Sequence, residues 1–186
     1  DPFCGSGTIP IEAAMMAANI APGMNRDFTA EDWPYVVGKG LWQDAQEEAE
    51  DLVNLEIETD IQGYDIDDHM VEIARENAKR AGVEKLIHFQ RRDVAQLSHP
   101  KKYGFIITNP PYGERLRDKE EMPALYRTIG ERFRLLDTWS MYLISSYEGA
   151  ERDIGRKADR NRKIYNGMMK AYYYQFLGPK PPRAKQ

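Results

Sequence analysis

Short apolar runs alternate with longer helix-forming stretches along most of this 186-residue chain, and this alternation is what most constrains its fold. Strand character occurs at residues 61–65, 86–90, 104–108 and 140–146. Helix character occurs at residues 8–18, 41–55, 67–82 and 123–137. Strands that alternate with helices pair in parallel and carry helices on both faces of the sheet. The sequence therefore predicts an α/β fold built on an open, mostly parallel sheet.

The end of the chain follows a different pattern. Residues 162–167 and 169–178 predict two antiparallel strands that turn at Asn166-Gly167, a pair favoured in tight hairpins. Residues 1–178 are expected to form one domain, and residues 179–186, "PKPPRAKQ", a flexible tail. The chain also opens on a glycine turn, which normally follows a hydrophobic strand. We therefore expect the first strand of the sheet to lie upstream of residue 1.

Composition narrows the classes of function. The one cysteine, Cys4, and three scattered histidines exclude a disulfide framework or a cysteine metal cluster, so we expect no metal. No apolar run approaches the roughly 20 residues that cross a membrane, and the expected setting is a reducing cytoplasm. The net charge of −4 is uneven, because residues 151–186 carry ten Lys and Arg against three acids. Such a basic segment suits a polyanion, although a solvated surface explains it equally well.

The opening stretch "DPFCGSGT" predicts a ligand-binding turn. Gly5 and Gly7 let the backbone approach a ligand closely, and the helix from Thr8 offers free N–H groups to an anion such as a carboxylate. No Lys follows the last glycine, and Pro10 stands where a dinucleotide-binding turn has its third glycine. Both departures weaken a nucleoside triphosphate or simple dinucleotide interpretation. A purely structural turn is the alternative.

Acids recur at the carboxyl ends of two successive predicted strands. Asp65 can accept hydrogen bonds from a ribose diol, and the neighbouring Ile66 can pack on an adenine face. Asp93 can accept from an exocyclic amine of adenine, with a backbone N–H from Val94. Each acid alone could equally be a loop carboxylate. Their recurrence at strand ends favours a nucleoside site, because ligands bind there in such sheets.

The stretch "NPPY" follows the buried strand at 104–108. The carboxamide of Asn109 and the carbonyl of Pro110 are two acceptors that can hold one amine and favour its pyramidal form. Pro110 and Pro111 fix the backbone and remove competing donors, and Tyr112 offers a ring for stacking a planar base. A rigid turn that closes a strand is the alternative. In this position the four residues predict a catalytic clamp for an amine.

Together these stretches resemble the class I S-adenosylmethionine (SAM)-dependent methyltransferases, which have a Rossmann-like sheet and modify exocyclic amines of nucleic-acid bases. The resemblance implies that "NPPY" is catalytic, with Asn109 also near the cofactor. It implies a SAM site formed by the glycine loop and the two strand-end acids with their neighbours: Asp1, Phe3, Cys4, Gly5, Gly7, Thr8, Asp65, Ile66, Asp93 and Val94.

Longer stretches are more specific. "NIAPGMNRDF", "NPPYGERL" and "ADRNRKIYNGMMKAYYYQF" resemble the bacterial methyltransferases of guanine N2 in 23S ribosomal RNA, a family often labelled adenine-specific DNA methylases. The resemblance implies an RNA partner and a THUMP RNA-binding domain upstream. "NPPY" alone does not separate guanine from adenine or RNA from DNA. An adenine-N6 DNA methyltransferase and a transfer-RNA guanine-N2 methyltransferase therefore remain alternatives.

The implied chemistry is direct in-line methyl transfer without a covalent enzyme intermediate. Cys4 is expected to pack in the loop, because covalent cytosine methylation would need Pro-Cys where this chain has Pro110-Pro111. Two rival classes were considered. A catalytically silent RNA-binding module is disfavoured by the intact "NPPY" and glycine loop, and an NAD-dependent dehydrogenase by "NPPY" and Pro10.

Overall fold

The computed structural model describes residues 1–33, 35–38, 40–112 and 116–182. Within these residues the strands are β1 (Ile61–Asp65), β2 (Ile87–Arg91), β3 (Phe105–Thr108), β4 (Ser140–Ser145), β5 (Arg160–Asn166) and β6 (Met169–Phe176). The α-helices are α1 (Thr8–Ala17), α2 (Leu41–Asp51), α3 (Asp68–Arg80), α4 (Leu116–Leu135) and α5 (Ala150–Ile154). Short 3₁₀ turns lie at Thr29–Asp32, Glu84–Leu86 and Val94–Gln96.

All the predicted strands and helices are present, with differences in helix bounds. Helix α4 starts at Leu116 and contains Pro123 in its interior. The sequence predicted that this helix starts at residue 123, because proline is favoured in a first helical turn. Helix α2 ends at Asp51 rather than 55, and α5 was not predicted at all, since its five residues are too few to show a period. The tail predicted at 179–186 has no regular structure to residue 182, and 183–186 lie outside the described residues.

The strands pair as the alternation predicts. β1 pairs in parallel with β2, and β3 pairs in parallel with β4. The terminal hairpin is antiparallel: β6 pairs with β4 and β5 pairs with β6, which gives the order β3-β4-β6-β5. The expected parallel sheet with an antiparallel C-terminal hairpin is confirmed, but it consists of a two-stranded and a four-stranded part.

Asp1 joins the two parts of the sheet. Its terminal ammonium donates to the Gln62 carbonyl (2.8 Å) and its carbonyl accepts from the Tyr64 N–H (2.7 Å), the pattern of a residue paired in parallel beside Gly63 of β1. Its carboxylate accepts a 2.6 Å hydrogen bond from the Thr108 hydroxyl at the end of β3. Asp1 therefore lies between β1 and β3 and bridges them.

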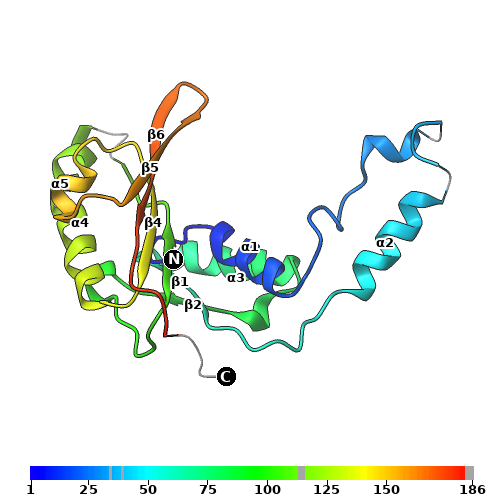
Figure 1. The fold of residues 1–186 in the computed structure, drawn as a ribbon, viewed down its shortest axis with the longest axis horizontal. Helices are drawn as coiled ribbons and strands as arrows, with labels where there is room; N and C mark the ends of the chain where they lie inside the picture. Colours follow the sequence, from blue (N-terminus) through cyan, green and yellow to red (C-terminus); the bar gives the residue numbers. More distant parts are fainter. Residues whose placement is uncertain (34, 39, 113–115, 183–186) are drawn as a thin grey trace.

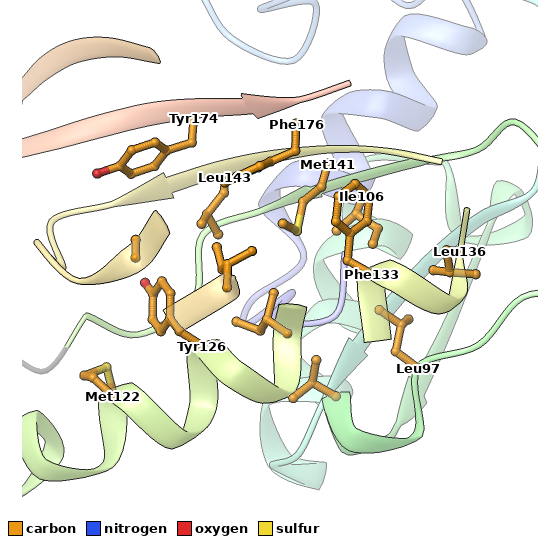
Figure 2. Close-up of a cluster of buried hydrophobic side chains, with 14 of the residues drawn as sticks. Leu97, Ile106, Met122, Tyr126, Phe133, Leu136, Met141, Leu143, Tyr174 and Phe176 are labelled. Carbon is orange, nitrogen blue, oxygen red and sulfur yellow. The ribbon is translucent and has the colours of Figure 1, made fainter. Parts of the chain in front are cut away.

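Two hydrophobic cores hold the helices to the strands. α4 and α5 cover one face of the four-stranded part (Figure 1), and Tyr126 and Phe133 of α4 pack toward Met141, Leu143 and Phe176 (Figure 2). α1 and α3 lie side by side beside β1 and β2 and form the second core with Phe89. The face of β3 opposite α4 is open, since Phe105 is 63% and Ile107 43% exposed.

Two segments project from this body (Figure 1). The first, called the acidic arm here, spans residues 20–60 and carries α2, in which no residue is buried. The arm holds eleven Asp and Glu against Arg26 and Lys39. The second is the β5–β6 hairpin, whose tip extends beyond β4 and exposes Tyr165 (66%) and Met168 (100%). In the part of the chain that the structure describes, no helix has the length and apolar character needed to span a membrane.

Candidate active site

The glycine loop is held in place by hydrogen bonds to two elements, β1 and α3. The Cys4 N–H donates to the Tyr64 carbonyl of β1 (2.8 Å), and the Gly5 N–H donates to the Asp65 carboxylate (3.0 Å). The Asn77 amide of α3 donates to the Ser6 carbonyl (3.0 Å). Gly5 adopts φ +51°, and a Cβ there would meet only the Met70 methyl within 4 Å. The loop therefore turns an open stretch of backbone toward whatever binds above it.

Gly7 has a different task from Gly5. It adopts φ +88° as the N-cap of α1, and a Cβ would lie 3.0–3.1 Å from side chains of Ala74, Ile11 and Phe89. The absence of a side chain at Gly7 therefore lets α1 pack against α3 and β2. Any contact of Gly7 with a ligand would come from its backbone. Thr8 begins α1 and is exposed, as the first helical position of an anion-binding helix must be.

Asp65 ends β1 with both carboxylate oxygens engaged by backbone. One oxygen accepts from Gly5 N–H and the other from Asp67 N–H, each at 3.0 Å. A carboxylate has about four lone-pair sites, so two remain for a ribose diol. Ile66 is 62% exposed beside it and offers a flat apolar surface. The predicted pair thus lies together and open to a ligand.

Asp93 lies at the neighbouring strand end. The Arg92 N–H donates to the Asp65 carbonyl (2.8 Å), which brings the ends of β1 and β2 together. One Asp93 oxygen accepts from the Ala95 N–H (2.7 Å) and caps the 3₁₀ turn at Val94–Gln96. Its second oxygen can accept an exocyclic amine. The Val94 side chain is buried, so its contribution would come from the backbone.

The "NPPY" stretch leaves the sheet at the carboxyl end of β3. Asn109 is exposed there, on the same face of the strand as Ile107, while Pro110 is fully buried. Tyr112 is half-buried at the far end of the loop, and residues 113–115, which belong to the resembling stretch "NPPYGERL", lie outside the described residues. A buried proline that anchors an exposed amide is the geometry expected of a rigid clamp.

The Thr108–Asp1 hydrogen bond brings the glycine loop and the "NPPY" loop together. Thr108 is 1% exposed and immediately precedes Asn109, and the Asp1 carboxylate that it meets also accepts the Phe3 N–H (3.0 Å). The predicted cofactor residues of the first loop and the predicted catalytic residues are thus joined through a single carboxylate. Sequence reasoning missed Thr108 because nothing local marks it as more than a β-branched strand residue.

Cys4 is unsuited to nucleophilic attack. Burial, with a smaller effect from the nearby Asp65 carboxylate, raises the pKa of its thiol to about 11, so it stays protonated at neutral pH. Its side chain is 6% exposed and packs in the core of α1, α3 and β2. A role for Cys4 at the cofactor would therefore rest on its backbone. Among the described residues, no three His, Cys, Asp or Glu side chains gather as a metal site would require.

A cavity of about 390 Å³ extends from Asp1 and Pro2 between β1 and β3 toward the starts of these strands. It is bounded by the starts of β1 (Ile61) and β3 (Phe105), with Leu136 and Trp139 among its apolar walls. Asp65, Asp93 and Asn109 are not among its lining residues. It is a gap between the two parts of the sheet, and the polar strand ends rather than this cavity form the candidate active site.

A glycine loop, acids at two strand ends and "NPPY" at a third, on this sheet, define a class I methyltransferase. The chain belongs to the family described as "RMKL-like, methyltransferase domain" (UPF0020), whose model matches residues 1–175. It is 47% identical over 186 residues to the "Putative RNA methyltransferase YpsC" of Bacillus subtilis (strain 168), covering 100% of this chain and 48% of that protein.

Two further comparisons agree. The chain is 40% identical over 178 residues to the "Ribosomal RNA large subunit methyltransferase K/L" of Shewanella baltica (strain OS185), covering 93% of this chain and 25% of that protein. The crystal structure of SMU.472 complexed with SAH superposes with a TM-score of 0.91 at 44% identity, covering 98% of this chain and 48% of that one. This chain thus spans half or less of the length of these relatives.

Proposed function

We propose that this chain is the catalytic unit of a SAM-dependent methyltransferase that acts on the exocyclic amine of an RNA base in the cytoplasm, with guanine N2 of 23S ribosomal RNA as the favoured target. The observation that carries the proposal is the exposed Asn109, held on a buried Pro110 directly beside the glycine loop. The ribosomal target is supported by the resemblance and by the name of the Shewanella relative.

The residues present fit SAM. The open backbone at Gly5 and the start of α1 suit the amino-acid end of the cofactor. The two free lone-pair sites on Asp65 suit a ribose diol, and Ile66 and the second Asp93 oxygen suit an adenine. SAM when bound supplies a methyl group on a sulfonium, which is already a good leaving group.

The chain's own contribution is to hold the amine in line with that methyl group. The Asn109 carboxamide oxygen and the Pro110 carbonyl accept the two N–H bonds of the base and leave its lone pair free to attack. With SAM bound, this lone pair would form the new nitrogen–carbon bond, and the electrons of the broken sulfur–carbon bond would stay on the leaving thioether. The methylated amine then releases its extra proton to solvent.

The β5–β6 hairpin supports RNA as the substrate. Arg160, Arg162 and Lys163 are exposed along β5, the edge strand of the sheet. Arg162 pairs opposite Tyr173 and therefore lies on the same face of the sheet as this ring. Cations beside an aromatic ring on an exposed edge suit phosphate contact and base stacking. The acidic arm, by contrast, repels a polyanion.

The proposal is tested by incubating the full-length enzyme with labelled SAM and unmodified ribosomal RNA, transfer RNA or DNA, followed by mass spectrometry of the nucleosides. N2-methylguanosine in ribosomal RNA is expected. N6-methyladenine in DNA, or methylguanosine confined to transfer RNA, would instead establish one of the two alternatives.

The role of the hairpin is tested by charge reversal at Arg160, Arg162 and Lys163. RNA affinity is expected to fall. The plot of the logarithm of the binding constant against the logarithm of salt concentration should become shallower, by about 0.7–0.9 in slope for each lost phosphate contact. Reversal of the same number of acids on α2, at Glu47, Glu48 and Asp51, is the control. An unchanged salt slope would remove β5 from the RNA-binding surface.

We further propose that residues preceding Asp1 add a strand between β1 and β3, so that residues 1–178 form the larger part of the methyltransferase domain. Asp1 is already in parallel register with Gly63, and the apolar cavity continues from it along the starts of both strands. A THUMP domain farther upstream would supply RNA capture. Hydrogen exchange would test the strand: the amides of Gln62 and Phe105, which face the gap between β1 and β3, should exchange more slowly in the longer protein than in residues 1–186.

A further inference from the structure

A buried chain of hydroxyl groups lies behind the "NPPY" loop, outside the residues assigned above to cofactor or base. The Tyr126 hydroxyl of α4 lies 2.5 Å from the Ser145 hydroxyl at the end of β4, and 3.5 Å from the Pro111 carbonyl. Ser145 also accepts the Tyr147 N–H at 3.0 Å. The Tyr126 hydroxyl therefore links the end of β4 to one peptide group of the loop.

The hydroxyl protons have a consistent direction along this chain. The Pro111 carbonyl can only accept, so the arrangement that satisfies every group has Tyr126 donating to it and Ser145 donating to the Tyr126 oxygen. The Ser145 oxygen then accepts from the Tyr147 backbone. Burial raises the pKa of Tyr126, with Tyr112 and other neighbouring phenols acting in the same direction, so the proton remains on Tyr126 at neutral pH.

The setting of these hydroxyls is rigid and dry. Tyr126 and Ser145 are both 0% exposed, and Figure 2 shows the Tyr126 ring rising from α4 toward the strands in the main core. The ring packs against Tyr147 at 4.8 Å between centroids. Tyr147 is in turn fixed by its hydroxyl bond to Asp153 (2.5 Å). A polar group at such depth is costly unless it is hydrogen-bonded, so an orienting role is a reason to retain it.

We propose that Tyr126 and Ser145 are positioning residues that fix the peptide between Pro111 and Tyr112, and with it the orientation of the base-stacking ring and of the Asn109–Pro110 acceptors. The inference rests on the proposed function, because it presumes that this loop holds the target amine. The 3.5 Å contact is longer than the 2.7–2.8 Å usual for a hydroxyl donor, and catalytic contacts often tighten when substrate binds.

The test uses Tyr126→Phe, Ser145→Ala and the double variant in the full-length enzyme, with Tyr174→Phe as the matched control. Tyr174 is 5% exposed in the same core and lies outside the hydroxyl chain. Both single variants should lower kcat about 10- to 100-fold, as a small misplacement of reacting groups does, and leave KM for SAM within about threefold. The double variant should be no slower than the slower single variant, because both break one chain.

A second measurement does not depend on activity. Hydrogen exchange at the Tyr112 amide should accelerate in Tyr126→Phe and stay at the wild-type rate in Tyr174→Phe. Equal kcat values in Tyr126→Phe and Tyr174→Phe, or losses that multiply in the double variant, would overturn the proposal. A wild-type enzyme that methylates no RNA would instead overturn the proposed function, while the exchange measurement would still decide whether Tyr126 orders the loop.

Discussion

The strand ends on the two sides of the glycine loop are held in different ways. On the cofactor side, Asp65 and Asp93 each accept a hydrogen bond from the backbone N–H of the residue two positions farther along the chain. On the catalytic side, Thr108 immediately before Asn109 donates to Asp1, and the carbonyl of Pro111, two residues after Asn109, accepts from Tyr126. The two acids thus organise their own turns, whereas the turn around Asn109 is supported by side chains from elsewhere in the fold.

This difference indicates how each side tolerates change. A carboxylate that organises its own loop carries the ligand contact and the loop geometry in one residue. In the proposed site the catalytic loop has those tasks divided: the exposed Asn109 would meet the substrate, while Thr108, Tyr126 and Ser145 would hold the backbone. Substitutions should therefore separate binding from chemistry on the catalytic side and should not do so on the cofactor side.

The largest effect is expected for Asn109→Ala. Removing the side-chain acceptor should lower single-turnover methyl transfer about 1000-fold, as loss of a preorganised transition-state contact does, while SAM affinity stays within a few-fold. Transfer of labelled methyl groups and calorimetric SAM binding would measure the two quantities. Asn54→Ala, in the acidic arm, is the control, and near wild-type transfer by Asn109→Ala would exclude Asn109 as an acceptor.

Asp65→Ala should act on binding. The variant loses the proposed ribose contact and the anchor of the Gly5 N–H together, so SAM affinity should fall about 100-fold, the upper range for hydrogen bonds to a charged group. Asp67→Ala is a matched control, because Asp67 caps α3 by accepting the His69 N–H. The control should lose about 1 kcal/mol of stability and keep its SAM affinity. Equal SAM affinities for the two variants would contradict the assignment of Asp65.

Thr108→Val removes the hydrogen bond that joins the glycine loop to the catalytic loop. Valine keeps the shape but not the hydroxyl that donates to Asp1, so the free energy of unfolding should drop by about 1–3 kcal/mol, measured by urea denaturation. Thr128→Val is the control, since the Thr128 hydroxyl bonds only the Ala124 carbonyl on the exposed side of α4. A smaller loss in Thr108→Val than in Thr128→Val would mean that the bridge does not hold the loops.

The smallest effect concerns alkaline pH. The pKa of Cys4 is raised from 9.0 to about 11 in the folded chain, so the folded state keeps the thiol proton longer than the unfolded state. The contribution of the Cys4 thiol to the free energy of unfolding is complete below about pH 9 and should be lost as the pH rises toward 11. Denaturation midpoints at pH 8 and 10.5 would show the loss. Cys4→Ala should remove this part of the pH dependence, and an unchanged dependence would assign it to other groups.

The residues predicted for the cofactor side are marked by local signals in the sequence. Asp65 and Asp93 follow apolar runs directly, and Gly5 and Gly7 lie in one short turn before a helix. The strands and their parallel pairing followed from the same alternation. "NPPY" was visible for the same reason, since its prolines and aromatic ring are unusual after a strand.

The side chains that support the two loops could not be found this way. Tyr126 and Ser145 read as ordinary members of a helix and a strand, and Asn77 as part of the packing face of α3. In the structure α3 buries Val71, Ala74 and Ala78, while the Asn77 amide holds the glycine loop. Which polar side chain meets which backbone group depends on the packing of distant elements, and no local pattern encodes that.

The contacts of Asp1 also bear on the order in which the molecule assembles. Its bonds join residues 61 and 107 positions apart in the chain, so the glycine loop cannot be locked until both β1 and β3 have formed. Contacts of such long sequence separation are the slow part of folding, because their loop-closure entropy is lost before they contribute stability. The candidate cofactor site on residues 1–8 is therefore among the last features to become rigid. Tight binding of SAM would signal that folding has finished.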